Sequence, residues 1–262
     1  MKNQRQNEIL EILKNEKFVS VSDLSERLYA SQPTVRRDLS DLERQGLIRR
    51  SHGGAIPADD KNGIPVFFRS GTQSAEKLRI CRMAVGLISP GALIFTDAST
   101  TALHLGDFLK EADGITVVTN GLLSCKQLSE KRIRVCSTGG VLLQDSLAFV
   151  GETARRTVAH YNADVFFFSS SSLGDNGMIS DYSEEETDLR MCMAERAETK
   201  VFLCDSGKFG SRSAYNLFAL SDVDYAVTGA PLPCTVPEAC GLRLVKAGEA
   251  FLYEKVHESV LN

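Results

Sequence analysis

The chain has 262 residues, of which 43% are hydrophobic, enough for a sizeable core in one large domain or in two smaller ones. No run approaches the ~20 continuous apolar residues of a membrane span, and the polar start lacks the apolar stretch of a signal peptide. We therefore expect a cytoplasmic protein without a membrane partner. Residues 1–57 carry ten Lys and Arg against eight Asp and Glu, whereas the remainder carries 20 against 26. A weakly basic head before an acidic body fits a nucleic-acid-binding module joined to a second domain.

The cysteines give little support to a metal site or a disulfide framework. The seven are scattered, and no two have the C-x-x-C spacing. Cys204, for example, ends the apolar run that starts at Val201. We interpret them as reduced thiols that pack as small hydrophobic side chains, and we expect neither a metal nor a cofactor.

The first 57 residues predict three helices. Apolar residues at helical spacing indicate a helix over 3–17, followed by a short extended piece. Ser22 is expected to cap the second helix, and Ser31 the third, which tolerates Pro33 in its first turn. The buried face of the third helix recurs at i, i+4 and i+7: Val35, Leu39 and Leu42.

The outer face of the third helix carries side chains that can read DNA. The candidates are Gln32, Thr34, Arg36 and Arg37. The major groove admits one helix, in which Arg can bond guanine and Gln adenine through two hydrogen bonds each. Which arginine contacts a base and which a phosphate stays open. The same helix carries Asp38, Asp41 and Glu43, a charge mixture that by itself is also typical of a solvated face.

A second basic group follows at the predicted wing. Its members are Arg44, Arg49, Arg50 and His52, and residues 47–50 are expected to form a strand that enters a Gly53-Gly54 turn. Arginines on such a hairpin suit phosphate contacts or insertion into the minor groove. Three helices, a turn, an Arg-Arg pair and a basic wing together predict a winged helix-turn-helix over residues 1–57, with Arg49, Arg50 and His52 on DNA.

Residues 58–72 are polar, rich in Gly and Pro at first, and predict a linker. From 73 to 262, helical stretches alternate with short apolar strands, which indicates a mostly parallel, Rossmann-like α/β domain covered on both faces. The strand candidates are 93–95, 115–118, 133–136, 164–168, 201–204 and 225–227.

Small and polar residues follow these strands, and the carboxyl ends of parallel strands form the usual ligand site. Hydroxyls and backbone amides, with a lysine opposite, indicate an anion site for phosphate, with Asp97 and Asn120 left to bond sugar hydroxyls. The alternatives are plain: Ser99, Thr100 and Thr101 can merely cap a helix, and Lys208 can be a surface lysine. The convergence of five such loops on one edge favours a pocket.

Two sets of motifs resemble the DeoR-type regulators. The first is Ser31-Gln32-Pro33-Thr34-Val35-Arg36-Arg37-Asp38-Leu39 with the wing His52-Gly53-Gly54-Ala55. The second comprises Glu76-Lys77, Asp97-Ala98-Ser99-Thr100-Thr101, Thr119-Asn120, Gly139-Gly140, Gly151 and Asp205-Ser206-Gly207-Lys208-Phe209-Gly210. The resemblance implies a sensor domain related to ribose-5-phosphate isomerase.

By this resemblance, the effector contacts would be Lys77, Asp97, Ser99, Thr100, Thr101, Asn120, Gly140 and Lys208. Ser99 stands where the family pattern has glycine, which narrows that loop. The resemblance further implies a repressor of a carbohydrate operon that binds double-stranded operator DNA as a homo-oligomer, a dimer or tetramer, and leaves it when a phosphorylated sugar binds.

The alternative is a sugar-phosphate isomerase-like enzyme with an accessory DNA-binding head. An aldose–ketose isomerase needs a positioned carboxylate base and groups that stabilise an enediolate. The acidic D-G-A-D-E loop and the K-G-G-G loop of the related isomerases are both missing from this sequence. We therefore expect sensing without catalysis.

Overall fold

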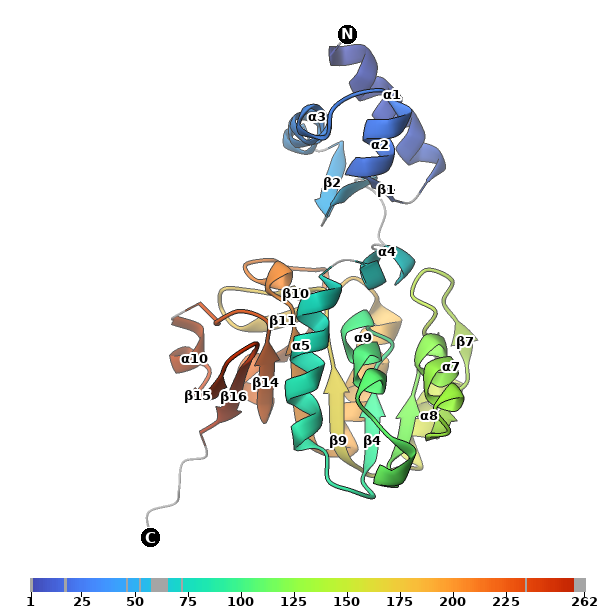
Figure 1. Cartoon of the computed structure of the whole chain (residues 1–262), viewed down its shortest axis with the longest axis vertical. Helices are drawn as coiled ribbons and strands as arrows, with labels where there is room; N and C mark the ends of the chain where they lie inside the picture. Colours follow the sequence, from blue (N-terminus) through green and yellow to red (C-terminus); the bar gives the residue numbers. More distant parts are fainter. Residues whose placement is uncertain are drawn as a thin grey trace. The chain divides into compact units, whose positions relative to one another are not determined.

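The computed structural model describes residues 2–16, 18–45, 47–51, 53–57, 66–71, 73–233 and 235–256 (Figure 1). The chain divides into two compact units, Met1–Thr72 and Gln73–Asn262, here called the head and the α/β unit. In the segment predicted as linker, residues 58–65 and 72 lie outside the described residues. A short helix, α4 (Val66–Gly71), occupies the rest of it.

The head is a winged helix-turn-helix. Its elements are α1 (Lys2–Asn15), β1 (Val19–Ser20), α2 (Val21–Arg27), α3 (Gln32–Arg44), β2 (Ile48–Ser51) and β3 (Gly54–Pro57). The strands form an antiparallel sheet in the order β1-β3-β2, so β2 and β3 make the wing hairpin. This arrangement has the three helices and the wing that the sequence predicts.

Helix capping in the head differs from the prediction at one point. Ser20, not Ser22, caps α2, because the Ser20 hydroxyl accepts a hydrogen bond from the Asp23 amide at 3.0 Å. Ser31 does precede α3 as the N-cap residue, but its hydroxyl lies 2.9 Å from the Thr34 hydroxyl rather than on a backbone amide. The prediction for Ser31 is therefore confirmed in position only.

A small apolar core holds the head together. Leu24 of α2 and Val35 and Leu39 of α3 are fully buried in it, together with Ile9 of α1. An ion pair between Arg5 Nε and the buried Asp38 Oδ2, 2.5 Å long, also joins α1 to α3. The orientation of α3 is thus set by its apolar face and by one carboxylate.

The α/β unit is built on a mostly parallel sheet, as the sequence predicts. Within the described residues it has eight strands, in the order β15-β16-β14-β12-β9-β4-β5-β6. Their bounds are β4 (Leu93–Thr96), β5 (Thr116–Thr119), β6 (Arg134–Ser137), β9 (Ala163–Phe168), β12 (Ala197–Cys204), β14 (Tyr225–Thr228), β15 (Leu242–Ala247) and β16 (Phe251–Lys255). The strands β4, β5, β6, β9, β12 and β14 run parallel and correspond to the six predicted ones.

Both faces of this sheet are covered. The helices are α5 (Ser74–Ala84), α6 (Thr100–Leu103), α7 (Leu122–Glu130), α8 (Glu152–Ala159), α9 (Glu184–Glu195) and α10 (Thr235–Ala239). Along β9, Val165 and Phe167 join the core under α5 and α7, whereas Phe166 and Phe168 join the core under α8 and α9. Two buried faces explain why these strands are apolar almost throughout.

Three further pieces were not predicted. A small sheet forms from β10 (Ser172–Leu173), β11 (Met178–Asp181) and β13 (Tyr215–Ala219), and a hairpin from β7 (Val141–Leu142) and β8 (Phe149–Val150). The last strands, β16 and β15, extend the main sheet in antiparallel orientation beyond β14. Residues 242–247 and 251–255 thus extend the sheet on the side where the sequence predicts no strand.

Within the described part of the chain, every helix is too short or too polar to cross a membrane. The same residues contain no group of three or more His, Cys, Asp or Glu side chains that could hold a metal ion. Burial raises the pKa of the Cys81 and Cys204 thiols, which keeps them protonated and unreactive at neutral pH.

Candidate DNA interface and effector site

The outer face of α3 presents the side chains singled out for reading DNA. Gln32, Arg36 and Arg37 are exposed, and Thr34 is half-buried next to Ser31. Val35 and Leu39, in contrast, are fully buried in the head core. Two arginines and a glutamine therefore project from the first half of the helix, the part that approaches base edges when a helix enters the major groove.

The wing brings one arginine onto the same helix. The Arg50 guanidinium donates a hydrogen bond of 2.8 Å to the Ser40 hydroxyl, and the Arg50 amide donates one of 2.9 Å to Glu43. Ser40 lies one turn after Arg36 and bonds its carbonyl oxygen. Arg50 thus lies against the helix that carries the exposed Arg36 and Arg37. Arg49, the adjacent residue of β2, is half-buried and points to the other side of the strand. His52 lies outside the described residues.

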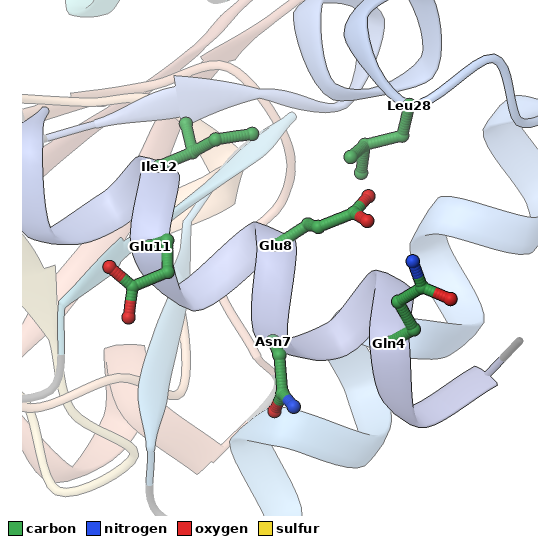
Figure 2. Close-up of a pocket in the computed structure, with 6 residues that line it drawn as sticks. All are labelled: Gln4, Asn7, Glu8, Glu11, Ile12 and Leu28. Atoms are coloured by element: carbon green, nitrogen blue, oxygen red, sulfur yellow. The ribbon is translucent and has the colours of Figure 1, made fainter.

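A shallow hollow on the head marks a surface unsuited to DNA. It is formed by α1 and the end of α2 and is lined by Gln4, Asn7, Glu8, Glu11, Ile12 and Leu28 (Figure 2). The Glu8 carboxylate points across the hollow toward Leu28. Its two carboxylates, Glu8 and Glu11, would repel phosphate, in contrast to the arginines of α3.

In the α/β unit, two lysines converge on neighbouring threonines at the carboxyl edge of the sheet. Lys77 of α5 is buried, and its Nζ lies 3.1 Å from the Thr100 hydroxyl. Lys208, in the 3₁₀ turn after β12, has its Nζ 3.4 Å from the Thr101 hydroxyl and 2.7 Å from the Ser169 hydroxyl. Lys208 also forms an ion pair of 3.0 Å with Asp205. It is therefore an inward-facing lysine, not a surface one.

Asp97 is the centre of a protein hydrogen-bond network. Its Oδ1 accepts from the Ser99 amide and hydroxyl at 3.1 and 2.5 Å, and its Oδ2 accepts from the Ser169 amide at 3.2 Å. Oδ2 also meets Arg190 Nε at 2.8 Å. With four protein donors around it and no exposed surface, Asp97 organises the loops rather than offering a free carboxylate.

Ser99 has its hydroxyl turned inward, between Asp97 and the Ala102 amide, where it caps α6. Its φ of −69° is ordinary for an L-residue. The structural role that the sequence left open for this serine is thus observed, and the side chain points into the loop.

Arg190 was not singled out from the sequence, yet it holds this edge together. It is 3% exposed and forms ion pairs with Asp97, with Asp181 of β11 at 2.9 Å and with Glu186 of α9 at 3.1 Å. Burial alone would lower the pKa of Arg190, but Asp181, Asp97 and Glu186 outweigh it and raise the pKa above its usual value. One cation of α9 therefore joins the Asp97 loop, 93 positions away in the chain, to the nearby strand β11 and to its own helix.

Asn120 and Gly140 lie on the neighbouring loops. Asn120 follows β5, is 2% exposed, and donates from Nδ2 to the Phe149 carbonyl oxygen at 3.1 Å. Among the described residues, its buried Oδ1 has no hydrogen-bond partner. Gly140 has a φ of 111°, and a Cβ there would lie 2.4 Å from the Val150 carbonyl oxygen, which explains the glycine as the entry to the β7–β8 hairpin.

Comparison with known proteins agrees with both units. The profile of the DeoR-like helix-turn-helix domain matches residues 5–61, and that of the DeoR C terminal sensor domain matches residues 72–230. The chain belongs to the DeoR family of transcriptional regulators. It is therefore a DNA-binding regulator, as its head predicts.

Individual DeoR-family proteins align over most of this regulator. An uncharacterized HTH-type transcriptional regulator, YulB of Bacillus subtilis, is 35% identical over 231 residues, 87% of this chain and 89% of that protein. The glycerol-3-phosphate regulon repressor of Escherichia coli is 30% identical over 234 residues, 89% of this chain and 93% of its own length. Both names describe regulators, not enzymes, in line with the expectation of no catalysis.

A ribose 5-phosphate isomerase from Methanocaldococcus jannaschii resembles this DeoR-family chain over 53% of its residues, with 14% identity and a TM-score of 0.40. A likeness this remote has no bearing on activity.

Proposed function

We propose that this regulator represses a carbohydrate-metabolism operon and leaves its operator when a phosphorylated sugar or polyol binds the α/β unit. The single observation that carries the effector half is the convergence of Lys77 and Lys208 on Thr100 and Thr101. Ammonium groups and hydroxyls at one sheet edge are the donors that a phosphate dianion needs. The name of the Escherichia coli relative, a repressor of a glycerol-3-phosphate regulon, supports the same class of effector.

The proposed effector contacts divide into two groups. Lys77, Thr100, Thr101 and Lys208 bind the phosphate, and the acceptor Asn120 Oδ1 takes a hydroxyl of the carbon chain. Asp97 and Ser99 set the geometry of the threonine loop from behind, and Gly140 allows the neighbouring turn to approach closely. The buried acceptor on Asn120 and the full set of donors around Asp97 support this division.

On the DNA side, the proposed contacts are Gln32, Thr34, Arg36, Arg37, Arg49, Arg50 and His52. We propose a homodimer or tetramer acting in the cytoplasm, where its operator is. Two heads related by a two-fold axis would bind half-sites separated by whole turns of the double helix. The effector then acts only as far as it binds the released and the DNA-bound arrangements unequally.

Alanine at Arg36 or Arg37 tests the head assignment. We expect at least one of the two variants to lose about 1–3 kcal/mol of operator affinity and to discriminate less at one base pair. Arg50→Ala is expected to weaken all duplexes alike and to reduce the salt slope by about one, because a wing arginine on phosphate reads no sequence. Binding is measured by fluorescence anisotropy at several salt concentrations, with an operator selected from a random duplex pool by the wild type.

The outcome that contradicts the head assignment is clear. If all three variants bind the selected operator like the wild type at moderate salt, α3 and the wing are not the DNA interface. Arg156→Ala serves as a control, because this exposed arginine of the α/β unit pairs with Glu152 of the same helix.

Thermal-shift measurements with phosphorylated compounds test the effector half. The panel contains inorganic phosphate and three esters, glycerol 3-phosphate, ribose 5-phosphate and fructose 1-phosphate, each ester beside its unphosphorylated parent. We expect one or more phosphorylated members to raise the Tm, because a ligand that binds only the folded state stabilises it. Lys208→Ala should remove this shift and the release of operator, while DNA binding without effector stays normal.

The matched control is Lys126→Ala, an exposed lysine of α7 that pairs with Glu130. A Lys208→Ala variant that retains full release would show that the phosphate binds elsewhere. A wild type whose Tm ignores every phosphorylated compound would contradict sugar-phosphate sensing itself and leave a DNA binder without such a ligand.

A further inference from the structure

The first turn of α5 lies where the effector site meets the chain that leads to the head. Gln73 precedes this helix with a left-handed φ of 53°, and its carbonyl oxygen accepts hydrogen bonds from the Glu76 and Lys77 amides, both at 3.0 Å. The covalent path from the α/β unit to the head begins immediately before Gln73. A displacement of this turn would therefore act directly on that path.

Glu76 fastens this turn to the loop that carries Lys208. Its two carboxylate oxygens accept hydrogen bonds from the Ser206 amide at 2.8 Å and from the Ser206 hydroxyl at 3.1 Å. Ser206 opens the 3₁₀ turn that ends at Lys208. Gly229 makes room for the contact, since a Cβ at that position would lie 1.8 Å from Glu76 Oε1.

Lys77, the residue after Glu76, joins the first turn of α5 to the loop that carries Thr100 and Thr101. Lys77 Nζ bonds the Thr100 hydroxyl, and Lys208 Nζ in turn reaches the Thr101 hydroxyl. Glu76, Ser206, Lys208, the two threonines and Lys77 thus form a closed ring of contacts. The first turn of α5 belongs to this ring on both sides, through two consecutive residues.

We propose that Glu76 is the positioning residue that couples effector binding to the first turn of α5, and so to the release of DNA. This inference rests on the proposed function. A phosphate at the threonines would replace lysine–hydroxyl hydrogen bonds by stronger ones between oppositely charged groups, and would change the position of Lys208 relative to Thr101. Glu76 bonds the backbone of the 3₁₀ turn that ends at Lys208, so it passes that change to the first turn of α5.

The rival role for Glu76 is purely structural, and the two roles differ in what they affect. A structural contact would lower the Tm and the affinity for effector, but a fully occupied site would still release DNA. A coupling contact sets the extent of release at saturation. The informative quantity is therefore the fraction of operator released at saturating effector, measured separately from the affinity for it.

The first variant is Glu76→Ala in the full chain. We expect operator affinity without effector to stay within about twofold of the wild type, because Glu76 is not part of the head. Affinity for glycerol 3-phosphate, or for the panel member that binds the wild type most tightly, should change by about tenfold or less, so saturation is reached. The fraction of operator released at saturating effector should fall to less than a quarter of the wild-type value. Arg79→Ala is the control, because this α5 residue bonds Glu249 rather than the ring.

Two more variants separate position from charge. Glu76→Gln should retain release, because its carbonyl oxygen still accepts from the Ser206 amide and its NH2 donates to the Ser206 hydroxyl. Gly229→Ala leaves Glu76 charged but displaces it, and should lose release as Glu76→Ala does. In the double variant Glu76→Ala/Gly229→Ala, the second change should add nothing further, which is the signature of two residues acting through one contact.

Each outcome decides the matter. Release by Glu76→Ala equal to that of the wild type at saturation overturns the coupling role, even if affinity or Tm falls. Should Glu76→Ala fail to fold, the two single variants Glu76→Gln and Gly229→Ala are compared instead. Full release of operator by Gly229→Ala then overturns the coupling role. If neither the Tm nor the operator binding of the wild type changes with any panel member, the proposed function is overturned, and this inference with it. If the wild type and Glu76→Ala both release operator fully, only the coupling role of Glu76 is overturned.

Discussion

Replacing Arg190 by methionine is expected to lower the free energy of unfolding of the α/β unit by about 3–5 kcal/mol. The arginine is 3% exposed and is the partner of Asp97, Asp181 and Glu186. Methionine fills much of the volume but leaves three carboxylates facing one another at the edge of the core. Since the removal of one partner leaves buried charge uncompensated, the loss exceeds what the ion pairs contribute net.

Tyrosine fluorescence during urea unfolding measures this loss, because the chain has no Trp and five of its six Tyr lie after residue 73. Arg156→Met is the control: its ion pair with Glu152 is exposed, and such pairs contribute about 0–1 kcal/mol. A free energy of unfolding for Arg190→Met within about 1 kcal/mol of the wild type would show that the three carboxylates tolerate one another without the arginine.

The second large effect is expected in the head. Leu39→Ala should cost about 2–5 kcal/mol, because Leu39 is fully buried and the cavity would open between α3 and the other helices. A unit of this size has a total stability of roughly 4–11 kcal/mol. The change therefore removes a large share of it, and we expect operator binding to be lost although Leu39 does not face DNA.

The α/β unit should be unaffected by this substitution. Its thermal shift with phosphorylated compounds should equal that of the wild type. The unfolding transition of the head, followed by far-UV circular dichroism, should move to lower temperature. Leu47→Ala provides the matched control, since the same chemical change at a leucine that is 45% exposed should cost less than about 0.5 kcal/mol. Normal operator binding by Leu39→Ala would contradict the account of how α3 is held.

Local patterns were enough for the framework of both units. The i, i+4, i+7 spacing of Val35, Leu39 and Leu42 predicted the buried face of α3, because helical geometry repeats whatever the surroundings. The six apolar runs became parallel strands for a similar reason, since a strand covered on both faces has no polar side. The hairpin of β15 and β16 escaped prediction: β15 is exposed along most of its length, so its pairing depends on β16 and β14.

The candidate site was predicted in part. Residues in the segments that follow strands, such as Thr101 and Lys208, could be placed at one edge because parallel strands end together. Arg190 and Glu76 could not, because their roles depend on partners 93 and 130 positions away in the chain. The same holds for Asp97, whose carboxylate looked free in the sequence and is surrounded by donors in the fold.

The weakly basic head and its helix-turn-helix pattern were determined by the sequence alone, since charge and periodicity are properties of neighbouring residues. The charge balance after residue 57 and the alternation of helical stretches with apolar strands likewise implied a second, acidic α/β domain. Only the tertiary structure decided which polar residues of that domain are engaged by the protein and which face the site. Hydrogen bonds and ion pairs join residues that are close in space, and the closeness of Glu76 to Ser206 or of Asp97 to Arg190 exists only once the sheet has formed.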